Sequence, residues 1–540
     1  MKIALYGLPC AGKTSLMKKL TNIKIIHGSE KLNKLCNGHF SELSESEKKN
    51  VRIRYTEYVN NLKDDIIISD GHYSFLDNVV FTDEDRNLYD VFLYLYCNPQ
   101  IILNRMKQYE KNAKYATLSN EIIRKWQNFE LFSLRSECHK YGKDFYVIDD
   151  NELTSCKFQD FVEFLISGFS TYGHAEQLVK KIRDIYPNPC ELYITDGDKT
   201  IIKQDSFRSC CKGKTQIFDR NFYTGYQSYL FEHELKENMV DDRMVDQIEV
   251  NGFITEKIKD KKAIIISSGI KELWEKIAVR KHLSNVFADP MISADTKYYV
   301  VKLLREAGYR IIAYGDSKID LYMLQEADEG FLFIGDKLSR SLREEHIAGI
   351  KLIYNMEPYI LANENYEDVQ QDIAICKSAS GINGGKLAAA HLRLGQQIGS
   401  KIAELIPKQD TAIVVLERGG RFFGDGLYST FGGTFYSFNP KIDSIPNIDT
   451  PRIVIVDSVI NTGKSIVKQI DLLRKSHPNT EIVIATNVIQ RKALELFKNY
   501  KVYAVRISDN FYVGMKQANQ IAGTGPDTAD RLFNLIKSNF

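Results

Sequence analysis

Short runs of β-branched and aromatic residues alternate along the chain with longer segments whose apolar residues follow helical spacing. The clearest runs are KIALYG, DIIISD, DVFLYLY, ELYITD, AIIISS, RIIAYG, AIVVLE, RIVIVD and EIVIATNV. Strands that alternate with helical segments are typical of parallel sheets covered by helices. The pattern therefore predicts an α/β fold with a parallel sheet, flanked by helices, in each domain.

The chain is too long for one compact unit, because it has 540 residues and 44% of them are hydrophobic. We predict three domains, at residues 1–171, 172–359 and 360–540. The first boundary follows the strand FYVIDD and an amphipathic helix, and the second follows the segment KLIYNMEPYI. There is no low-complexity linker, so we expect the domains to pack against each other.

Composition and charge narrow the classes of function. The formal net charge is only +2, which provides no overall field for a polyanion such as nucleic acid. The start of the chain, MKIALYGLPCAGKT, reads as neither a signal nor a transit peptide, and no apolar stretch has membrane-spanning length. The nine cysteines form no CxxC pair. We therefore expect a cytoplasmic protein that acts on small molecules.

A glycine-containing phosphate loop follows the first strand. Gly7, Gly12, Lys13 and Thr14 in GLPCAGKT match the pattern GxxxxGK[ST], and the segment KTSLMKKL opens a helix directly after it. In such a loop the backbone N–H groups and the helix N-terminus face a phosphate chain. Lys13 would neutralise the β- and γ-phosphates of ATP and Thr14 would bind Mg²⁺, while Ser15 continues the loop into the helix.

Asp70 ends the strand DIIISD, where the edge of the sheet would face the nucleotide. It could hold Mg²⁺ through water or take a proton from the acceptor, and the alternative is a turn or cap residue. The segment DVFLYLYCNPQIILNRMKQ resembles the strand, proline and arginine-bearing helix before the lid of nucleoside and nucleotide kinases. This resemblance covers about residues 1–170 and implies that Arg105 is a lid-side cation. The phosphate acceptor stays open.

Four segments of the middle domain place side chains suited to phosphate chemistry at strand ends or on a following helix. They are Asp196 and Asp198 in ITDGDKT, Ser267 in IISSGI, Lys297 in ADTKYYVV, and Asp316 and Asp320 in GDSKID. One carboxylate can attack phosphorus while a second, two residues on, protonates the leaving group and activates water. Carboxylates four residues apart after a strand can share Mg²⁺ with the nucleophile.

In this order the segments resemble haloacid-dehalogenase-type phosphatases, most closely the phosphoserine-phosphatase branch. The resemblance implies that Asp196 is the nucleophile, Asp198 the acid/base, Ser267 a phosphate ligand and Lys297 the phosphate-binding cation. Lys302 is an alternative for that cation. The resemblance also implies a Mg²⁺ site formed by Asp196, Asp198, Asp316 and Asp320, and a substrate-selecting helical cap at about residues 201–262.

A second phosphate loop lies in the C-terminal domain. The segment RIVIVDSVINTGKSI reads as a buried strand, an acidic turn at Asp457 and a loop that enters a helix. Backbone N–H groups and hydroxyls of this loop suit a 5′-phosphate, and its residues are Asn461, Thr462, Gly463, Lys464 and Ser465. Ser458 stands where an ATP loop needs its first glycine, so this loop is not a second ATP site.

Asp457 followed by Ser458 resembles the uracil phosphoribosyltransferases, which keep only the first of two adjacent acids. The segments LERGGRFFGDGL and IAGTGPDTADRLF are similar to that family's pyrophosphate turn and base-binding segment. The resemblance spans about residues 375–540 and implies that phosphoribosyl pyrophosphate (PRPP) contacts Arg418, with Arg421 as a second candidate. The matching positions in the base-binding segment are Gly523, Gly525, Asp527, Asp530 and Arg531. Pro526 departs from the family pattern and removes an N–H, so the base is left open.

Together these motifs predict a multifunctional enzyme that joins a nucleobase-like compound to PRPP, releasing a nucleoside monophosphate and pyrophosphate. ATP-dependent kinase and Mg²⁺-dependent phosphatase activities on related metabolites would accompany this reaction. Two alternatives are a polynucleotide kinase-phosphatase that processes nucleic-acid ends, and a regulator whose transferase-like domain senses a ligand. The balanced charge favours small molecules over nucleic acid. A homodimer, if one forms, would use the phosphoribosyltransferase domain.

Overall fold

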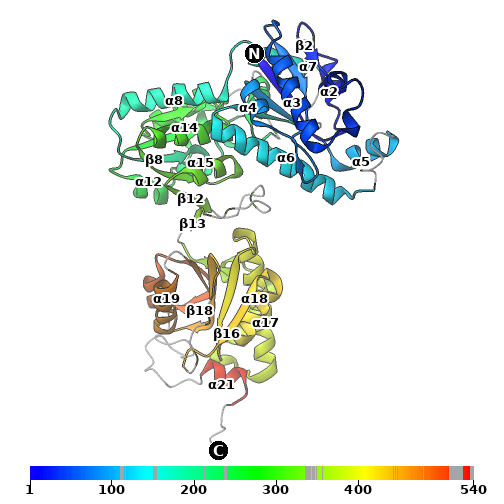
Figure 1. Ribbon diagram of the computed structural model, residues 1–540. Coiled ribbons are helices and arrows are strands. Elements are labelled where there is room, and N and C mark those ends of the chain that lie inside the picture. Colours follow the sequence, from blue (N-terminus) through cyan, green and yellow to red (C-terminus); the bar gives the residue numbers. More distant parts are fainter. Residues whose placement is uncertain are drawn as a thin grey trace, which may run out of the picture. The chain divides into compact units, whose positions relative to one another are not determined.

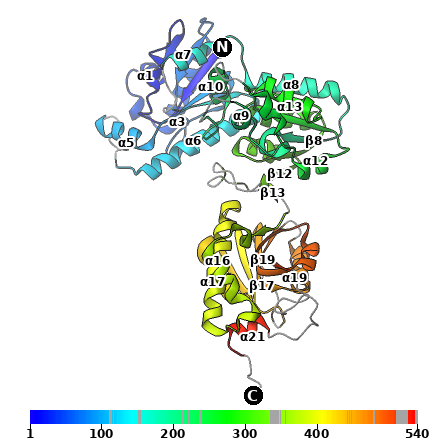
Figure 2. The same ribbon diagram turned by 180° about the vertical axis from the view of Figure 1, so that it is seen from behind.

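The computed structural model divides the chain into two compact units, residues 1–332 with 347–350, and residues 333–346 with 351–540. Helices lie on both sides of the main sheets (Figures 1 and 2), which confirms the predicted α/β fold. The structure describes residues 1–109, 117–149, 155–211, 221–235, 240–334, 349–354, 357–441, 448–477, 480–509 and 527–535, with a few single positions between these ranges. The division into three domains stays a prediction.

The first sheet is parallel, and β1 lies at its centre. Its strands have the order β2 (Lys24–Ile26), β3 (Ile67–Asp70), β1 (Lys2–Tyr6), β6 (Val91–Tyr96) and β7 (Asp144–Asp149). The accompanying helices are α1 (Lys13–Met17), α2 (Gly28–Leu35), α3 (Glu45–Asn60), α4 (Asp83–Leu88), α5 (Pro99–Gln108), α6 (Asn120–Tyr141) and α7 (Ser155–Ile166). The carboxyl ends of β1 and β3 therefore meet at one edge, where the first phosphate loop begins.

The second sheet of this unit is also parallel. Its strands have the order β10 (Val286–Ala288), β9 (Ala263–Ser267), β8 (Glu191–Asp196), β11 (Arg310–Gly315) and β12 (Glu329–Ile334). The next strand in the chain, β13 (Lys351–Tyr354), belongs to the second unit. The flanking helices are α8 (Thr171–Ile185), α13 (Lys271–Arg280), α14 (Ala294–Glu306) and α15 (Leu321–Glu326). Within the expected cap, the described residues form α9 (Ser206–Cys210), α10 (Gly225–Leu235), α11 (Asp242–Asp246) and α12 (Gly252–Ile258).

Helix α10 packs against β7, the edge strand of the first sheet. The Val147 backbone N–H donates to the Thr224 hydroxyl at 3.1 Å, and the Gln227 side-chain amide donates to the Val147 carbonyl at 2.9 Å. The rings of Tyr226 and Tyr229 lie 4.9 and 5.3 Å from that of Phe161 on α7. A helix of the expected cap is therefore anchored to the first sheet by directional bonds and aromatic packing.

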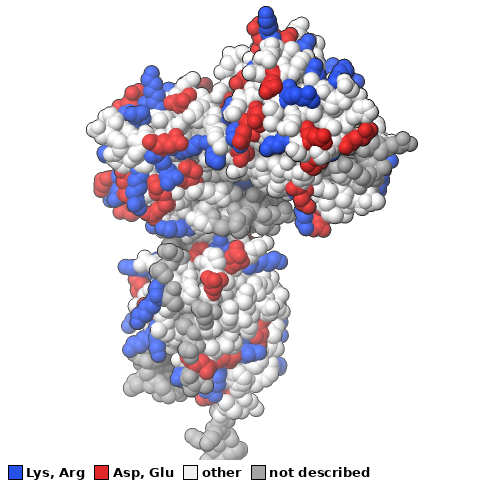
Figure 3. All heavy atoms as spheres, viewed as in Figure 1, with Lys and Arg blue, Asp and Glu red and all other residues white. Residues whose placement is uncertain are grey.

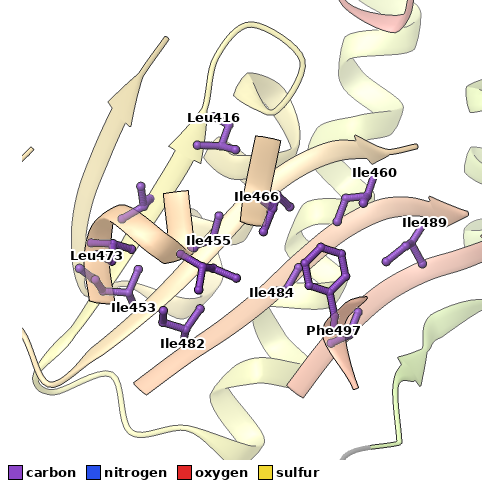
Figure 4. Close-up of a cluster of buried hydrophobic side chains, with 14 of the residues drawn as sticks. Leu416, Ile453, Ile455, Ile460, Ile466, Leu473, Ile482, Ile484, Ile489 and Phe497 are labelled. Carbon is purple, nitrogen blue, oxygen red and sulfur yellow. The ribbon is translucent and has the colours of Figure 1, made fainter. Parts of the chain in front are cut away.

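The second unit contains one parallel sheet. Its strands have the order β14 (Tyr359–Ile360), β19 (Lys501–Ser508), β18 (Glu481–Gln490), β17 (Arg452–Ile460), β15 (Thr411–Leu416) and β16 (Thr434–Phe438). The helices are α16 (Glu367–Cys376), α17 (Gly384–Leu405), α18 (Arg421–Phe431), α19 (Lys464–Ser476), α20 (Arg491–Leu494) and α21 (Thr528–Leu532). Figure 4 shows part of its core, where Ile455, Ile466, Ile484 and Phe497 belong to one buried cluster.

The surface has the mixed character that the balanced composition predicted. Lysine and arginine side chains are interspersed with aspartate and glutamate on the face shown in Figure 3. Among the described residues, no helix combines the length and the apolar character needed to cross a bilayer.

Helices α17 and α18 approach closely because glycines lie where they cross. A Cβ added at Gly395 would lie 2.1 Å from the Phe423 carbonyl oxygen, and one added at Gly426 would lie 2.0 Å from that of Leu392. Neither backbone oxygen can move without shifting its helix. A Cβ added at Gly385, also on α17, would meet no atom within 4 Å.

We predict that Gly395→Ala destabilises the second unit by about 1–3 kcal/mol, because overpacking pushes the two helices apart. The matched variant Gly385→Ala should leave stability unchanged or raise it slightly, because alanine has the higher helix propensity. Differential scanning calorimetry of the full chain measures both effects. Equal melting temperatures for the two variants would contradict the close approach.

Candidate functional site

Three carboxylates come together at the carboxyl edge of the second sheet. Asp196 ends β8, Asp316 directly follows β11, and Asp320 lies one short turn later. One ligand atom from each residue lies within 4.8 Å of those of the other two. Three carboxylate oxygens at this spacing are the donors that Mg²⁺ prefers, so these residues fit the expected metal site.

Lys297 is the cation at these carboxylates. Its ammonium donates to Asp196 Oδ1 and, at 2.7 Å, to Asp320 Oδ1, and its side chain is only 1% exposed. Lys302, the alternative, points elsewhere and donates to the carbonyl oxygens of His139 and Lys140 at 3.0 Å each. Of the two lysines, only Lys297 therefore occupies the place predicted for the phosphate-binding cation.

Burial raises the pKa of both aspartates of the first motif, that of Asp196 to about 7 against the opposing effect of Lys297. Burial raises the pKa of Asp198 to about 8, with help from Asp205 and Asp196. Its carboxylate accepts from the Ser206 N–H at 2.9 Å and from the Ser206 hydroxyl at 3.1 Å. Burial lowers the pKa of Lys297, but Asp196 and Asp320 outweigh this effect and leave it raised. Lys297 is therefore charged, and the raised pKa of Asp198 favours the protonated form that a general acid requires.

Ser267 lies beside the turn that follows Asp196. β8 and β9 are paired with Asp196 opposite Ile266, and Ser267 comes next on β9. A Cβ added at Gly197 would lie 2.9 Å from the Ser267 Cβ and 2.5 Å from Trp274. The Ser267 hydroxyl also accepts the Gly269 N–H at 3.1 Å. This glycine turn brings the predicted phosphate ligand next to the predicted nucleophile.

The first phosphate loop connects β1 to α1. Lys13 is buried, and its ammonium donates to the carbonyl oxygens of Gly7 and Leu8 at 2.5 and 3.1 Å. Burial lowers the pKa of Lys13 to about 8, against the opposing effect of Asp70. The Thr14 hydroxyl lies 3.4 Å from Asp70 Oδ2. The residues predicted to hold nucleotide phosphates and Mg²⁺ are therefore adjacent, and Ser15 follows them on the exposed side of α1.

Asp70 and Arg105 both contact backbone groups around this loop. Asp70 Oδ1 accepts the N–H of Gly28, the first residue of α2, at 2.6 Å. Arg105 donates to the carbonyl oxygens of Cys10 and Ala11 at 3.2 and 2.9 Å. Asp70 thus lies close to the loop and also bonds the first residue of α2. Its role at Mg²⁺ or at the acceptor stays a prediction. Arg105 therefore stabilises the loop through these hydrogen bonds.

Asp457 lies near the carboxyl end of β17. Burial raises its pKa to about 7, with Asp527 adding to the rise against the backbone N–H groups of Val459 and Ser458. Ser458 points into the core, where its hydroxyl lies 2.6 Å from His391 Nδ1. The acid and the serine therefore occupy opposite faces of the strand, as alternation requires.

The loop after β17 leads directly into α19. Gly463 has a φ of 72° and is the N-cap of that helix, where an added Cβ would lie 3.0 Å from Phe497. The side chains of Thr462, Lys464 and Ser465 are exposed, and that of Asn461 is half-buried. The loop thus leaves polar groups open to solvent at a helix N-terminus, as phosphate binding would need.

The predicted pyrophosphate and base segments meet near Asp457. Arg418 donates to Asp530 Oδ1 at 3.2 Å, and an added Cβ at Gly419 would lie 3.6 Å from Asp457 Oδ1. Asp527 caps α21 by accepting the Ala529 N–H at 2.7 Å. Gly523 and Gly525 lie outside the described residues.

Arg531, a matching position of the predicted base-binding segment, directs its side chain into the protein. Its side chain is 2% exposed and donates to the carbonyl oxygens of Cys376, Lys377 and Ile382 and to the Asn383 side chain. Through these hydrogen bonds, the guanidinium holds α21 against the segment before α17. Arg421, the second candidate for the pyrophosphate, pairs with Glu417 and Asp425 on the surface.

Two family models match separate parts of the chain. Residues 3–127 match the model described as AAA domain, and residues 392–535 match the model described as Uracil phosphoribosyltransferase. The chain contains a P-loop kinase-like domain and a uracil-phosphoribosyltransferase domain. A search of curated proteins finds no significant match.

Several solved structures also match parts of the chain. Shikimate kinase from Acinetobacter baumannii in complex with shikimate is 15% identical over 31% of this chain and 92% of its own, with a TM-score of 0.25. Xanthine-guanine-hypoxanthine phosphoribosyltransferase from Helicobacter pylori is 20% identical over 22% and 81%, with a TM-score of 0.19. A phospho-aspartyl intermediate analogue of phosphoserine phosphatase is 15% identical over 27% and 87%, with a TM-score of 0.20.

Sequence reasoning missed Glu130, a buried carboxylate behind the loop of the P-loop kinase-like domain. It accepts from the Ser74 N–H at 2.7 Å and the Tyr94 hydroxyl at 3.1 Å. Burial raises the pKa of Glu130 to about 7, and the charge of Lys13 acts against that rise. The available signal was a polar residue on the apolar face of helix 120–141, and no motif surrounds it.

We predict that Lys297→Met lowers phosphate release by about 100-fold or more, because the transferred group loses its buried cation. Lys302→Met should retain release within about twofold, because its ammonium contacts backbone oxygens of α6 and the Glu306 carboxylate, away from Asp196 and Asp320. Steady-state hydrolysis of p-nitrophenyl phosphate with Mg²⁺ measures both variants. The reverse order of losses would assign the cation to Lys302.

Proposed function

We propose that this chain is a multifunctional enzyme of nucleotide metabolism with phosphatase, phosphoribosyltransferase and kinase activities. The observation that supports it furthest is the contact of Lys297 with Asp196 and Asp320, beside Asp316. A buried lysine between carboxylates that converge from separate strands suits a phosphoryl group next to a divalent cation. The matches to the two family models support the kinase and phosphoribosyltransferase activities of this proposal.

In the proposed phosphatase reaction, Asp196 attacks phosphorus of a phosphate monoester while the bond to the leaving oxygen breaks. Asp198 gives its proton to that oxygen, which suits its raised pKa. Asp198 then takes a proton from water, whose oxygen attacks phosphorus and restores the Asp196 carboxylate. Lys297 and Ser267 hold the phosphoryl oxygens. Mg²⁺, when bound by Asp196, Asp316 and Asp320, offsets their negative charge.

In the proposed transferase reaction, PRPP reacts with a nucleobase-like compound at its anomeric carbon. The bond to pyrophosphate breaks ahead of the bond that forms to the base nitrogen, so positive charge develops on the sugar. The base nitrogen gives up its proton to solvent. Asp457 would orient the ribose hydroxyls, the loop of residues 461–465 would hold the 5′-phosphate, and Arg418 would face pyrophosphate. Mg²⁺ on the pyrophosphate would stabilise the leaving group.

In the proposed kinase reaction, the loop of residues 7–14 holds the phosphates of ATP. Lys13 would exchange its contacts with loop carbonyl oxygens for the β- and γ-phosphates, and Thr14 with Asp70 would hold Mg²⁺. The acceptor is a nucleoside-like or nucleotide-like hydroxyl compound. Because a kinase and a phosphatase acting on one compound would only consume ATP, their substrates differ or one step is gated.

We predict that Asp196→Asn abolishes phosphate release from monoesters while synthesis of nucleoside monophosphate from PRPP continues. The amide cannot attack phosphorus, yet it has nearly the same shape as the carboxylate. Phosphate release and PRPP consumption are measured on the same preparation. Joint loss of both activities would contradict separate sites.

We predict that the wild-type chain, given PRPP, Mg²⁺ and a panel of nucleobases, forms one nucleoside monophosphate that mass spectrometry identifies. Asp457→Asn should lower its rate by about 10–100-fold, because the ribose hydroxyls lose a charged acceptor. A ligand-sensing regulator would form no product in either protein. Parallel tests with 5′-hydroxyl oligonucleotides and ATP address the end-processing alternative, which faster turnover of oligonucleotides than of nucleosides would support.

A further inference from the structure

Helix α6 of the P-loop kinase-like domain contacts the helix that carries Lys297. Asp295 on α14 accepts from Arg135 Nε at 2.8 Å and lies 2.6 Å from His139 Nε2, and both partners belong to α6. Asp295 is 1% exposed. Figure 1 shows α6 beside α14 and α15. An ion pair of Arg135 and Asp295, with His139 beside it, is therefore buried between the first and second sheets of this unit.

The same two side chains of α6 contact further aromatic residues. The Arg135 guanidinium lies 4.1 Å from the ring centroid of Tyr322 on α15, and the His139 ring stacks on Tyr298 of α14 at 3.9 Å. Tyr322 comes two residues after Asp320. Asp295 comes two residues before Lys297. Arg135 thus reaches α14, which carries Lys297, and α15, which begins directly after Asp320.

The environment of Asp295 and His139 shifts the pKa of each side chain. Burial raises the pKa of Asp295, but Arg135 and His139 outweigh it and leave the pKa lowered. Burial lowers the pKa of His139 against its bond to Asp295. Asp295 is therefore a carboxylate, and a neutral His139 donates from Nε2, because a carboxylate can only accept.

The geometry of α14 links the contact of Asp295 with α6 to the orientation of Lys297. Two residues along an α-helix correspond to a rotation of roughly 200°, so Asp295 and Lys297 lie on nearly opposite sides of α14. Hydrogen bonds that hold Asp295 against α6 therefore turn Lys297 toward Asp196 and Asp320. An apolar contact of the same size would hold α14 in place without fixing this rotation, because dispersion forces are not directional.

We propose that Arg135 is a positioning residue of the phosphatase site, acting through Asp295 and Tyr322. It orients α14 and α15 so that Lys297 remains on Asp196 and Asp320. The phosphatase site is in this sense completed by the P-loop kinase-like domain, although Arg135 touches no reacting atom. This inference rests on the proposed phosphatase activity.

The test uses the full chain with the double variant Arg135→Met/Asp295→Leu. Arg135→Met alone would leave a buried carboxylate without its cation and could unfold the protein, whereas removing both charges avoids that penalty. Two readouts are compared at a temperature where circular dichroism shows a folded chain. They are turnover of p-nitrophenyl phosphate and the Kd of orthovanadate with Mg²⁺ by calorimetry.

We expect the double variant to retain its ATP affinity at the first loop while kcat falls about tenfold or more, because a displacement near 1 Å can have that effect. The Kd of orthovanadate should rise by a similar factor. Lys302→Met is the matched control, since it lies on the same helix pair without touching Asp295 or Tyr322, and it should match the wild type in both readouts.

The outcomes separate the two proposals. Wild-type kcat and wild-type orthovanadate affinity in the double variant would overturn the role of Arg135, as would equal losses in Lys302→Met. A wild-type chain that binds orthovanadate but hydrolyses no monoester would contradict the proposed phosphatase activity. The positioning role would then be judged by the orthovanadate affinities alone.

Discussion

Neighbouring strands of a parallel sheet end at the same edge, and this constraint builds the candidate sites of the chain. Asp196 ends β8, Ser267 ends β9 and Asp316 follows β11, so residues separated by 120 positions in the sequence become neighbours. The loops after β1 and β17 occupy the corresponding place in their own sheets. Each loop then enters a helix whose N-terminus faces the same edge. The placement of the candidate phosphate-binding groups therefore follows from strand direction.

Bringing carboxylates together has an electrostatic consequence that the fold must balance. Asp196, Asp316 and Asp320 would repel one another strongly in a buried setting, since like charges a few ångströms apart cannot all ionise without compensation. Lys297 supplies one compensating charge from α14. A divalent cation would add positive charge, and a phosphoryl group would add negative charge. Such a site can stay near electrical balance as phosphate enters and leaves.

The sequence predicted the parts of the molecule that depend on local signals. Strands were visible as short β-branched runs, and Lys13, Asp196 and Lys297 lie in segments whose residues suit phosphate chemistry. For Arg531 the motif gave a position in the base-binding segment but no side-chain direction, and its guanidinium bonds four oxygens of the segment before α17. Glu130, Arg135 and His391 were missed because their partners lie far away in the chain. Such contacts depend on tertiary packing.

The bonds from Thr224 and Gln227 to Val147 affect how this protein meets other chains. β7 is the last strand of its sheet, and an exposed last strand offers free N–H and C=O groups to which a foreign strand can add. Here one hydroxyl and one amide side chain take both groups of Val147, imitating a pairing partner. Strand addition at Val147 is therefore blocked without a sixth strand.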